Sequence, residues 1–124
     1  MGTRSRIAIR EDNGTIRSIY CHWDGYPAGV GRTLLESYCS VEKLGELMDR
    51  GDRSDLGASP EEGSAYADRG EDVPALMSAG LPELNKIDCG EEYVYLYEPA
   101  EDRWFFTRAH NKDWRELTLA ACED

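Results

Sequence analysis

The fold is decided by residues 20–31, which read Tyr-Cys-His-Trp-Asp-Gly-Tyr-Pro-Ala-Gly-Val-Gly. Before this stretch, residues 16–23 alternate apolar and polar side chains, which predicts a strand. After it, residues 30–38 carry apolar side chains at the i, i+4, i+8 spacing of a helix that faces a core. Pro27 disfavours helical geometry in the residue before it, so we expect the helix to begin beyond Gly29. The stretch is predicted to be a strand-to-helix elbow.

A β-hairpin is predicted upstream of the elbow, because residues 5–10 show the same alternation as residues 16–23. Ile7 and Ile19 share a face only if the residue numbers of each cross-strand pair add up to an even number. This requires an odd number of residues in the turn. A three-residue turn with Gly14 in the left-handed conformation meets this condition. The opposite face of the hairpin then carries a basic and aromatic set: Arg4, Arg6, Arg10, Tyr20 and His22.

A second helix is predicted over residues 41–50, with Ser40 as its N-cap and Gly51 as its C-terminal stop. Residues 51–63 are rich in Gly, Ser, Asp and Glu, which predicts a loop. Residues 64–68 are expected to form a short strand.

A second hairpin is predicted where residues 92–97 and 103–108 alternate aromatic and aliphatic side chains, so that both faces of the sheet are covered. Residues 81–89 resemble a short helix, with proline in the first turn. The pattern leaves strand and helix open for residues 73–80, and helix and edge strand open for residues 112–121.

Together these elements predict one α+β domain spanning residues 1–124. We expect an antiparallel sheet, built from the two hairpins and the short strand, with the helices of residues 30–50 packed on one face. The length of 124 residues fits a single compact domain.

Composition favours a soluble protein of the cytoplasm. No apolar run is long enough to cross a bilayer, and the first residues lack the apolar segment of a signal peptide. The four cysteines are widely spaced, with no Cys-x-x-Cys pair, which favours free thiols over a disulfide or zinc site. We expect no metal, no cofactor and no membrane partner.

The net charge of −11 is unevenly distributed along the chain. Residues 1–40 carry five arginines and four acids, whereas residues 41–124 carry nine basic and twenty-one acidic residues. An acidic surface repels nucleic acid and anionic membranes and attracts basic protein grooves. Direct nucleic-acid binding is therefore not expected.

One hypothesis places a small-ligand or nucleotide site at the elbow of residues 20–32. Its glycines precede a helix, whose free N-terminal amides can hold an anion, although their spacing matches no established phosphate loop. A simple elbow that needs small residues is the competing interpretation. No nucleophile accompanies the histidine of the elbow, so we expect no enzymatic activity. The candidate contact residues are Arg4, Tyr20, His22, Asp24, Tyr26 and Arg32.

The other hypothesis places the functional surface on the acids that follow the elbow. Carboxylates spaced over a rigid surface can imitate the phosphates of duplex DNA and occupy a basic groove. A solvated loop is the simpler alternative. The candidate partner-binding residues are Asp49, Asp52, Asp55, Glu61, Glu62, Asp68, Glu71 and Asp72.

Four segments carry a resemblance to a group of small phage and prophage proteins. These proteins begin Met-Gly-Thr-Arg-Ser and contain a Trp-Asp-Gly-Tyr-Pro turn, and the segments here are residues 2–6, 19–27, 68–72 and 91–97. The resemblance brings no catalytic residues with it. It implies an acidic accessory protein of a mobile element, a class in which inhibitors of CRISPR and other host defences are common.

The sequence thus predicts a non-enzymatic anti-defence inhibitor in the host cytoplasm. Its expected partner is a host effector protein with a basic, nucleic-acid-binding surface. The alternative is a protein that sequesters or hydrolyses a signalling nucleotide at the elbow.

Overall fold

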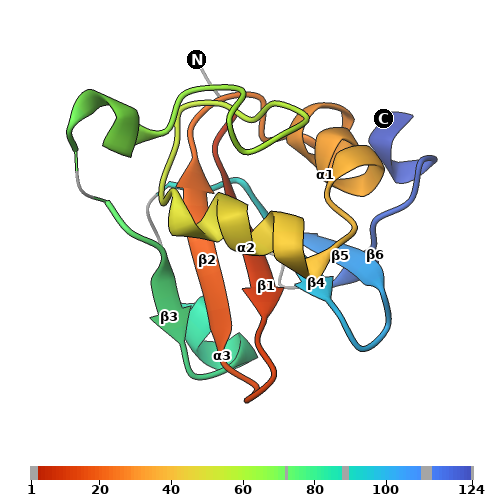
Figure 1. The fold of residues 1–124 in the computed structure, drawn as a ribbon. Helices are drawn as coiled ribbons and strands as arrows, with labels where there is room; N and C mark the ends of the chain where they lie inside the picture. Colours follow the sequence, from red (N-terminus) through yellow and green to blue (C-terminus); the bar gives the residue numbers. More distant parts are fainter. Residues whose placement is uncertain (1–2, 72, 88–89, 110–112, 124) are drawn as a thin grey trace.

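The computed structural model describes residues 3–71, 73–87, 90–109 and 113–123. A six-stranded sheet with the strand order β3-β2-β1-β4-β5-β6 forms its centre (Figure 1). The predicted α+β class is confirmed, and the sheet is larger than the two hairpins and one short strand that we expected. The strands are β1 (Ser5–Arg10), β2 (Ile16–Cys21), β3 (Leu76–Ser78), β4 (Tyr93–Glu98), β5 (Arg103–Arg108) and β6 (Arg115–Glu116).

The first hairpin has the predicted register. Ile7 lies opposite Ile19, so paired positions sum to an even number. The backbone amide of Glu11 donates to the carbonyl of Thr15, which leaves a three-residue turn, and Gly14 in that turn has a φ of +88°. The requirement that isoleucines share a buried face was therefore sufficient to fix the turn.

The expectation of an antiparallel sheet is wrong at its centre. β1 and β4, the first strands of the two hairpins, lie side by side and run parallel, with Ile7 beside Tyr95. The remaining pairings are antiparallel. Alternation along a strand defines its faces but not the direction of its neighbour, so this pairing was not visible in the sequence.

The helices after the elbow begin earlier than predicted. A π-helical turn, η1 (Pro27–Gly31), precedes α1 (Arg32–Ser37), so the helical backbone starts at Pro27 and not beyond Gly29. Proline restricts the residue before it, but its own fixed φ suits a first helical position. α2 (Val41–Asp49) follows as predicted, and its N-cap Ser40 accepts a hydrogen bond from the backbone amide of Lys43.

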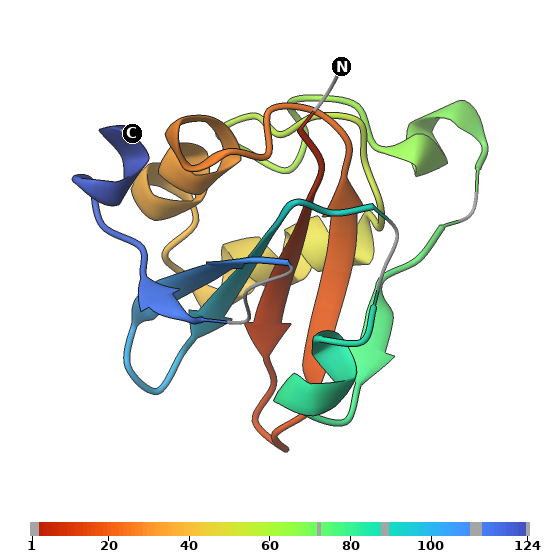
Figure 2. The same cartoon turned by 180° about the vertical axis from the view of Figure 1, so that it is seen from behind.

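Helices cover both faces of the sheet, not one. α1 and α2 pack on one face over a large core that includes Ile7, Leu34, Leu47 and Trp104. On the reverse face, seen in Figure 2, the short helix α3 (Leu81–Leu84) places Leu84 against a smaller apolar cluster. Both faces of β1 and β4 are consequently buried.

The segment after α2 is the irregular loop that was predicted, but residues 64–68 do not form a strand. Ala65 makes a single bridge to Arg53, and the 3-10 helix η2 (Tyr66–Arg69) follows at once. Of the two segments left open, residues 73–80 contain β3, and the described part of residues 112–121 contains β6. A last helical turn, η3 (Ala121–Glu123), packs against η1.

Within the described residues, no helix has both the length and the apolar character needed to cross a bilayer.

Candidate functional site

A buried arginine organises the loop that carries the acidic residues. Arg53 is fully buried, and its Nε donates to the carbonyl of Asp55 (2.6 Å) while Nη2 donates to the carbonyls of Glu62 (2.6 Å) and Pro60 (3.3 Å). Hydrogen bonds from a charged donor are stronger than those between neutral groups. One guanidinium group thereby ties together three points of the loop.

Further bonds attach this loop to the sheet and to the helices. The amides of His22 and Trp23 donate to the carbonyls of Arg53 (3.1 Å) and Ser54 (2.8 Å), which extends the line of β2. From the helical side, the Tyr38 hydroxyl donates to the carbonyl of Gly57 (2.9 Å). Burial raises the pKa of this hydroxyl group of Tyr38 to about 12. Together these hydrogen bonds make the loop a fixed part of the fold.

Six of the predicted partner-binding residues are exposed and form what we call the acidic face. They lie at the end of α2, in the loop that runs along the top of Figure 1 toward α1, and in or just after η2 at the upper left. Three of them pair with arginines, whereas no described cation lies within ion-pair distance of the other three. The paired residues are Asp49, Glu61 and Glu71, and the others are Asp55, Glu62 and Asp68.

The acidic face does not include the other two predicted residues. Asp52 turns inward, where its carboxylate accepts a hydrogen bond from the backbone amide of Tyr20 (2.8 Å). Burial raises the pKa of Asp52, while the Tyr20 amide and the charge of Arg6 oppose that shift. Asp72 lies outside the described residues. Asp52 therefore holds the loop to β2 and is only partly exposed.

The glycines of the elbow serve close packing. A side-chain carbon at Gly25 would lie 2.7 Å from Cβ of Ser5, and one at Gly29 would lie 2.3 Å from the carbonyl oxygen of Asp24. The amides that an anion would need are also engaged, because Gly29 donates to the carbonyl of Tyr26 and Val30 donates to that of Asp24. These contacts favour the interpretation of a simple elbow over that of a phosphate loop.

The predicted contact residues of the elbow do not form one site. Tyr20 and His22 pair with each other, through the hydroxyl and Nδ1 (2.8 Å). Tyr26 donates to Oδ1 of Asp24 (3.3 Å), and Arg32 pairs with Glu36 within α1. Arg4 is exposed near the start of β1.

A pocket of about 270 Å³ lies between the elbow and the loop, and we call it the elbow pocket. Asp24 and Arg32 line it together with Asp55 of the acidic face, so the structure joins part of both predicted sites. Glu36 also lines it, and so does Trp23, a residue that is 45% exposed. Three carboxylates and one guanidinium make this pocket complementary to a cation rather than to an anion.

The predicted basic and aromatic face of the first hairpin is covered at Arg6 and partly covered at Arg10, Tyr20 and His22. Arg6 is buried and donates to Glu91 (2.6 Å) and to the hydroxyl of Ser18 (3.0 Å). Arg10 pairs with Glu98 (2.8 Å). These two arginines neutralise acids of the same chain.

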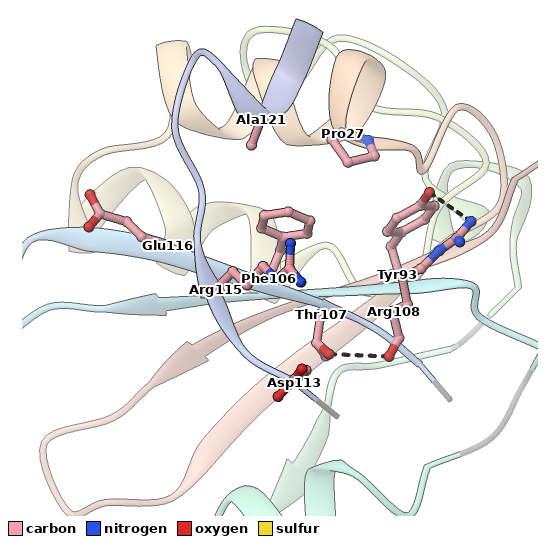
Figure 3. Close-up of a pocket in the computed structure, with 9 residues that line it drawn as sticks. All are labelled: Pro27, Tyr93, Phe106, Thr107, Arg108, Asp113, Arg115, Glu116 and Ala121. Carbon is pink, nitrogen blue, oxygen red and sulfur yellow. Dashed lines mark hydrogen bonds between the residues drawn. The ribbon is translucent and has the colours of Figure 1, made fainter. Parts of the chain in front are cut away.

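A larger cavity, of about 460 Å³, lies at the far edge of the sheet beneath η1 and η3. Figure 3 shows this edge cleft, with Pro27 and Ala121 above the side chains of β4, β5 and β6. Phe106 and Tyr93 contribute rings, and the guanidinium group of Arg108 lies 5.3 Å from the centre of the Tyr93 ring. The sequence analysis did not identify this site.

A signal for the edge cleft was present in the sequence. On β5, Phe106 and Arg108 share a face by alternation, and the register of the second hairpin puts Tyr93 directly opposite Arg108. Alternation did not reveal the position of β6. Its first residue, Arg115, pairs with Phe106 and so brings a second guanidinium group to the cleft. Short edge strands leave little pattern in a sequence.

Three of the four cysteines lie in the described residues. Cys21, Cys39 and Cys122 are free thiols, and burial raises the pKa of Cys21 to about 12. Across the parts of the chain that the structure describes, no three His, Cys, Asp or Glu side chains gather as metal ligands.

Comparison of the chain with protein families, with curated proteins and with solved structures finds no match. The acidic face and the two cavities are therefore the features that bear on function.

Proposed function

We propose that this chain is a non-enzymatic binding protein that engages a basic protein surface through its acidic face. The observation that carries the proposal is the fully buried Arg53, which fixes the loop at three carbonyl groups. Carboxylates on a fixed loop keep their spacing, and a binding partner does not have to order them. A flexible acidic loop would lose that advantage.

The pairing of the acids supports the same function. Asp55 and Asp68 accept hydrogen bonds from the backbone amides of Ser64 and Ala65, which orient their carboxylates without neutralising them. Asp49 bonds Arg17, yet its side chain remains 74% exposed. The acidic face thus presents oriented negative charge, of which the carboxylates of Asp55, Glu62 and Asp68 have no described cation within ion-pair distance.

The elbow pocket extends this surface and suits a basic partner. An arginine or lysine side chain entering it would meet the carboxylates of Asp24 and Asp55 and the exposed ring of Trp23. Carboxylates and an aromatic face are the two environments that a guanidinium group favours.

A surface of this kind competes with nucleic acid for a basic groove, because ion pairing and steering are the same for carboxylates and phosphates. Together with the resemblance to phage proteins, this supports an inhibitor of a host defence effector, of which a CRISPR effector with a DNA-binding channel is one example. The host cytoplasm is where such an inhibitor would act.

The test is capture of a partner from a bacterial host lysate on the immobilised protein. A quadruple variant, Asp55→Asn, Glu61→Gln, Glu62→Gln and Asp68→Asn, removes charge from the acidic face while keeping oxygen acceptors for the loop amides. A matched control neutralises four exposed acids elsewhere: Glu83→Gln, Glu92→Gln, Glu101→Gln and Glu123→Gln. Both variants carry the same net charge.

We expect the wild type and the control variant to retain the same nucleic-acid-binding protein, which duplex DNA displaces. The acidic-face variant should retain little of it. If both variants lose the captured protein equally, its binding depends only on net charge and not on the acidic face. If the acidic-face variant retains the captured protein, the proposal is contradicted.

A further inference from the structure

We propose that the edge cleft binds a small phosphorylated ligand with a flat aromatic ring, of the mononucleotide class. The cleft lies at the edge of the sheet formed by β5 and β6, and its residues are not those of the acidic face. The inference is therefore independent of the function proposed above. It rests on two arginines, two rings and the carboxylate of Asp113, which line the same cavity. A second carboxylate of the lining, that of Glu116, pairs with Arg103 (3.3 Å).

The two guanidinium groups of the cleft lack acidic partners. In a protein with 25 acids and 14 basic residues, neither Arg108 nor Arg115 has a carboxylate within ion-pair distance in the described part of the chain. By contrast, Arg103, which lies on β5 with Arg108, pairs with Glu116 (3.3 Å). Two unpaired guanidinium groups at one cavity favour an anion, and their forked donors fit a phosphate.

Arg108 is already held in position. Its guanidinium group lies over the ring of Tyr93, and Nη2 donates to the Tyr93 hydroxyl (3.2 Å). An arginine has five N–H donors, so this contact leaves donors for a ligand. Because the side chain is ordered before binding, less conformational entropy is lost when the ligand arrives.

The rest of the cleft determines what accompanies the phosphate. Phe106 is partly buried at its wall, close to Arg115 in Figure 3, and offers an apolar aromatic surface to a flat ring. Pro27 of η1 and Ala121 of η3 close the opposite side with small apolar groups. A base packed between these surfaces would be largely removed from water.

Asp113 adds a complementary requirement. Its carboxylate lines the cleft apart from the two guanidinium groups in Figure 3, and it is exposed. It repels a second anionic group and accepts hydrogen bonds from hydroxyl or amino groups. A ligand with one phosphate, a flat ring and several donors meets all three conditions, and the volume of about 460 Å³ lies in the range of small-molecule sites.

The experiment measures binding to the full chain by calorimetry and by thermal shift. The ligands are adenosine 5′-monophosphate and uridine 5′-monophosphate, with adenosine, uridine and inorganic phosphate as partial ligands. A ligand that binds only the folded protein raises its melting temperature. We expect a shift with at least one mononucleotide, and a dissociation constant at least about tenfold weaker for its nucleoside and for phosphate.

Three variants locate the site. Arg115→Gln is expected to weaken binding about tenfold or more without changing the melting temperature of the free protein, because Arg115 is exposed. Arg108→Gln should weaken binding as well. Arg32→Gln, at the elbow, should leave it unchanged.

Several results would overturn the proposal. They are no binding by either mononucleotide at millimolar concentration, phosphate binding as tightly as the nucleotide, and full affinity in Arg115→Gln. Loss of binding in Arg32→Gln with retention in Arg115→Gln would place the nucleotide at the elbow and also refute the edge cleft.

Discussion

Replacement of Arg53 by methionine should release the acidic loop. Methionine keeps much of the apolar volume of the arginine stem but cannot donate the three hydrogen bonds to the carbonyls of Asp55, Pro60 and Glu62. The loop would then have to expose these carbonyls to water or leave them unsatisfied. We therefore expect a large loss of stability, although Arg53, which is fully buried, lies outside the acidic face.

The magnitude follows from the three bonds. Hydrogen bonds to a charged group contribute about 1.5–3 kcal/mol each, and the loop recovers part of that by hydrating its carbonyls. A buried acceptor left unsatisfied costs about 1–3 kcal/mol, so over three carbonyls we expect a loss of about 4 kcal/mol in the free energy of unfolding. That is a substantial part of the roughly 5–15 kcal/mol of a typical domain.

Urea unfolding and amide hydrogen exchange of the Arg53→Met variant measure this loss. The amide of Ser64, which donates to Oδ1 of Asp55, should exchange faster than in the wild type. Arg69→Met is the matched control, because Arg69 is exposed and pairs only weakly with Glu71 (3.6 Å). A surface pair of this kind contributes less than about 1 kcal/mol.

The reasoning would be refuted if Arg53→Met unfolded within about 1 kcal/mol of Arg69→Met and left the exchange of the loop amides unchanged. In that case the loop would be held by its other contacts, and the rigidity that supports the proposed function would need another cause.

Three further predictions concern the groups around the elbow and the loop. Burial raises the pKa of Asp52, so this carboxyl group ionises less readily in the folded protein than in the unfolded chain, and the free energy of unfolding falls as the pH rises above about 4. Asp52→Asn should therefore have a free energy of unfolding at pH 7 that equals or exceeds that of the wild type. A lower value would contradict the direction of the pKa shift. Gly29→Ala should cost about 2 kcal/mol by chemical denaturation, since the new Cβ meets the Asp24 carbonyl oxygen at 2.3 Å, whereas Gly80→Ala, with nothing nearer than 3.7 Å, should cost clearly less. The raised pKa of Tyr38 means that the unfolded chain ionises first, so the free energy of unfolding should fall as pH rises from 10 to about 12; an equal fall in Tyr38→Phe would refute this.

The sequence carried enough information for most local elements of the fold. The alternation of Ile7 and Ile9 with Ile19 predicted the register of the first hairpin, and Ser40 marked the start of α2. The parallel pairing of β1 with β4 was missed, because it joins residues about ninety positions apart and each strand alone is compatible with either direction. Coverage of both faces was correct for β4 of the second hairpin and wrong for β5, which is only partly buried. The role of α3 in covering the sheet was not recognised.

The site was harder to predict, since charge in a sequence does not say where a side chain points. Asp52 looked like its acidic neighbours but turns inward to the Tyr20 amide. Arg53, which no pattern in the sequence singled out, is fully buried. The edge cleft depends on β6, a strand of two residues, to bring Arg115 near Arg108. Such placements are set by tertiary contacts and not by local patterns.

The most direct test of the central claim is the affinity between this protein and the partner it captures, measured at 50 and 200 mM salt with and without duplex DNA. If the acidic face occupies a nucleic-acid-binding groove, the dissociation constant should weaken at least about tenfold over that range, and DNA should compete for the same groove. A dissociation constant independent of salt, or a stable ternary complex with DNA, would contradict the account.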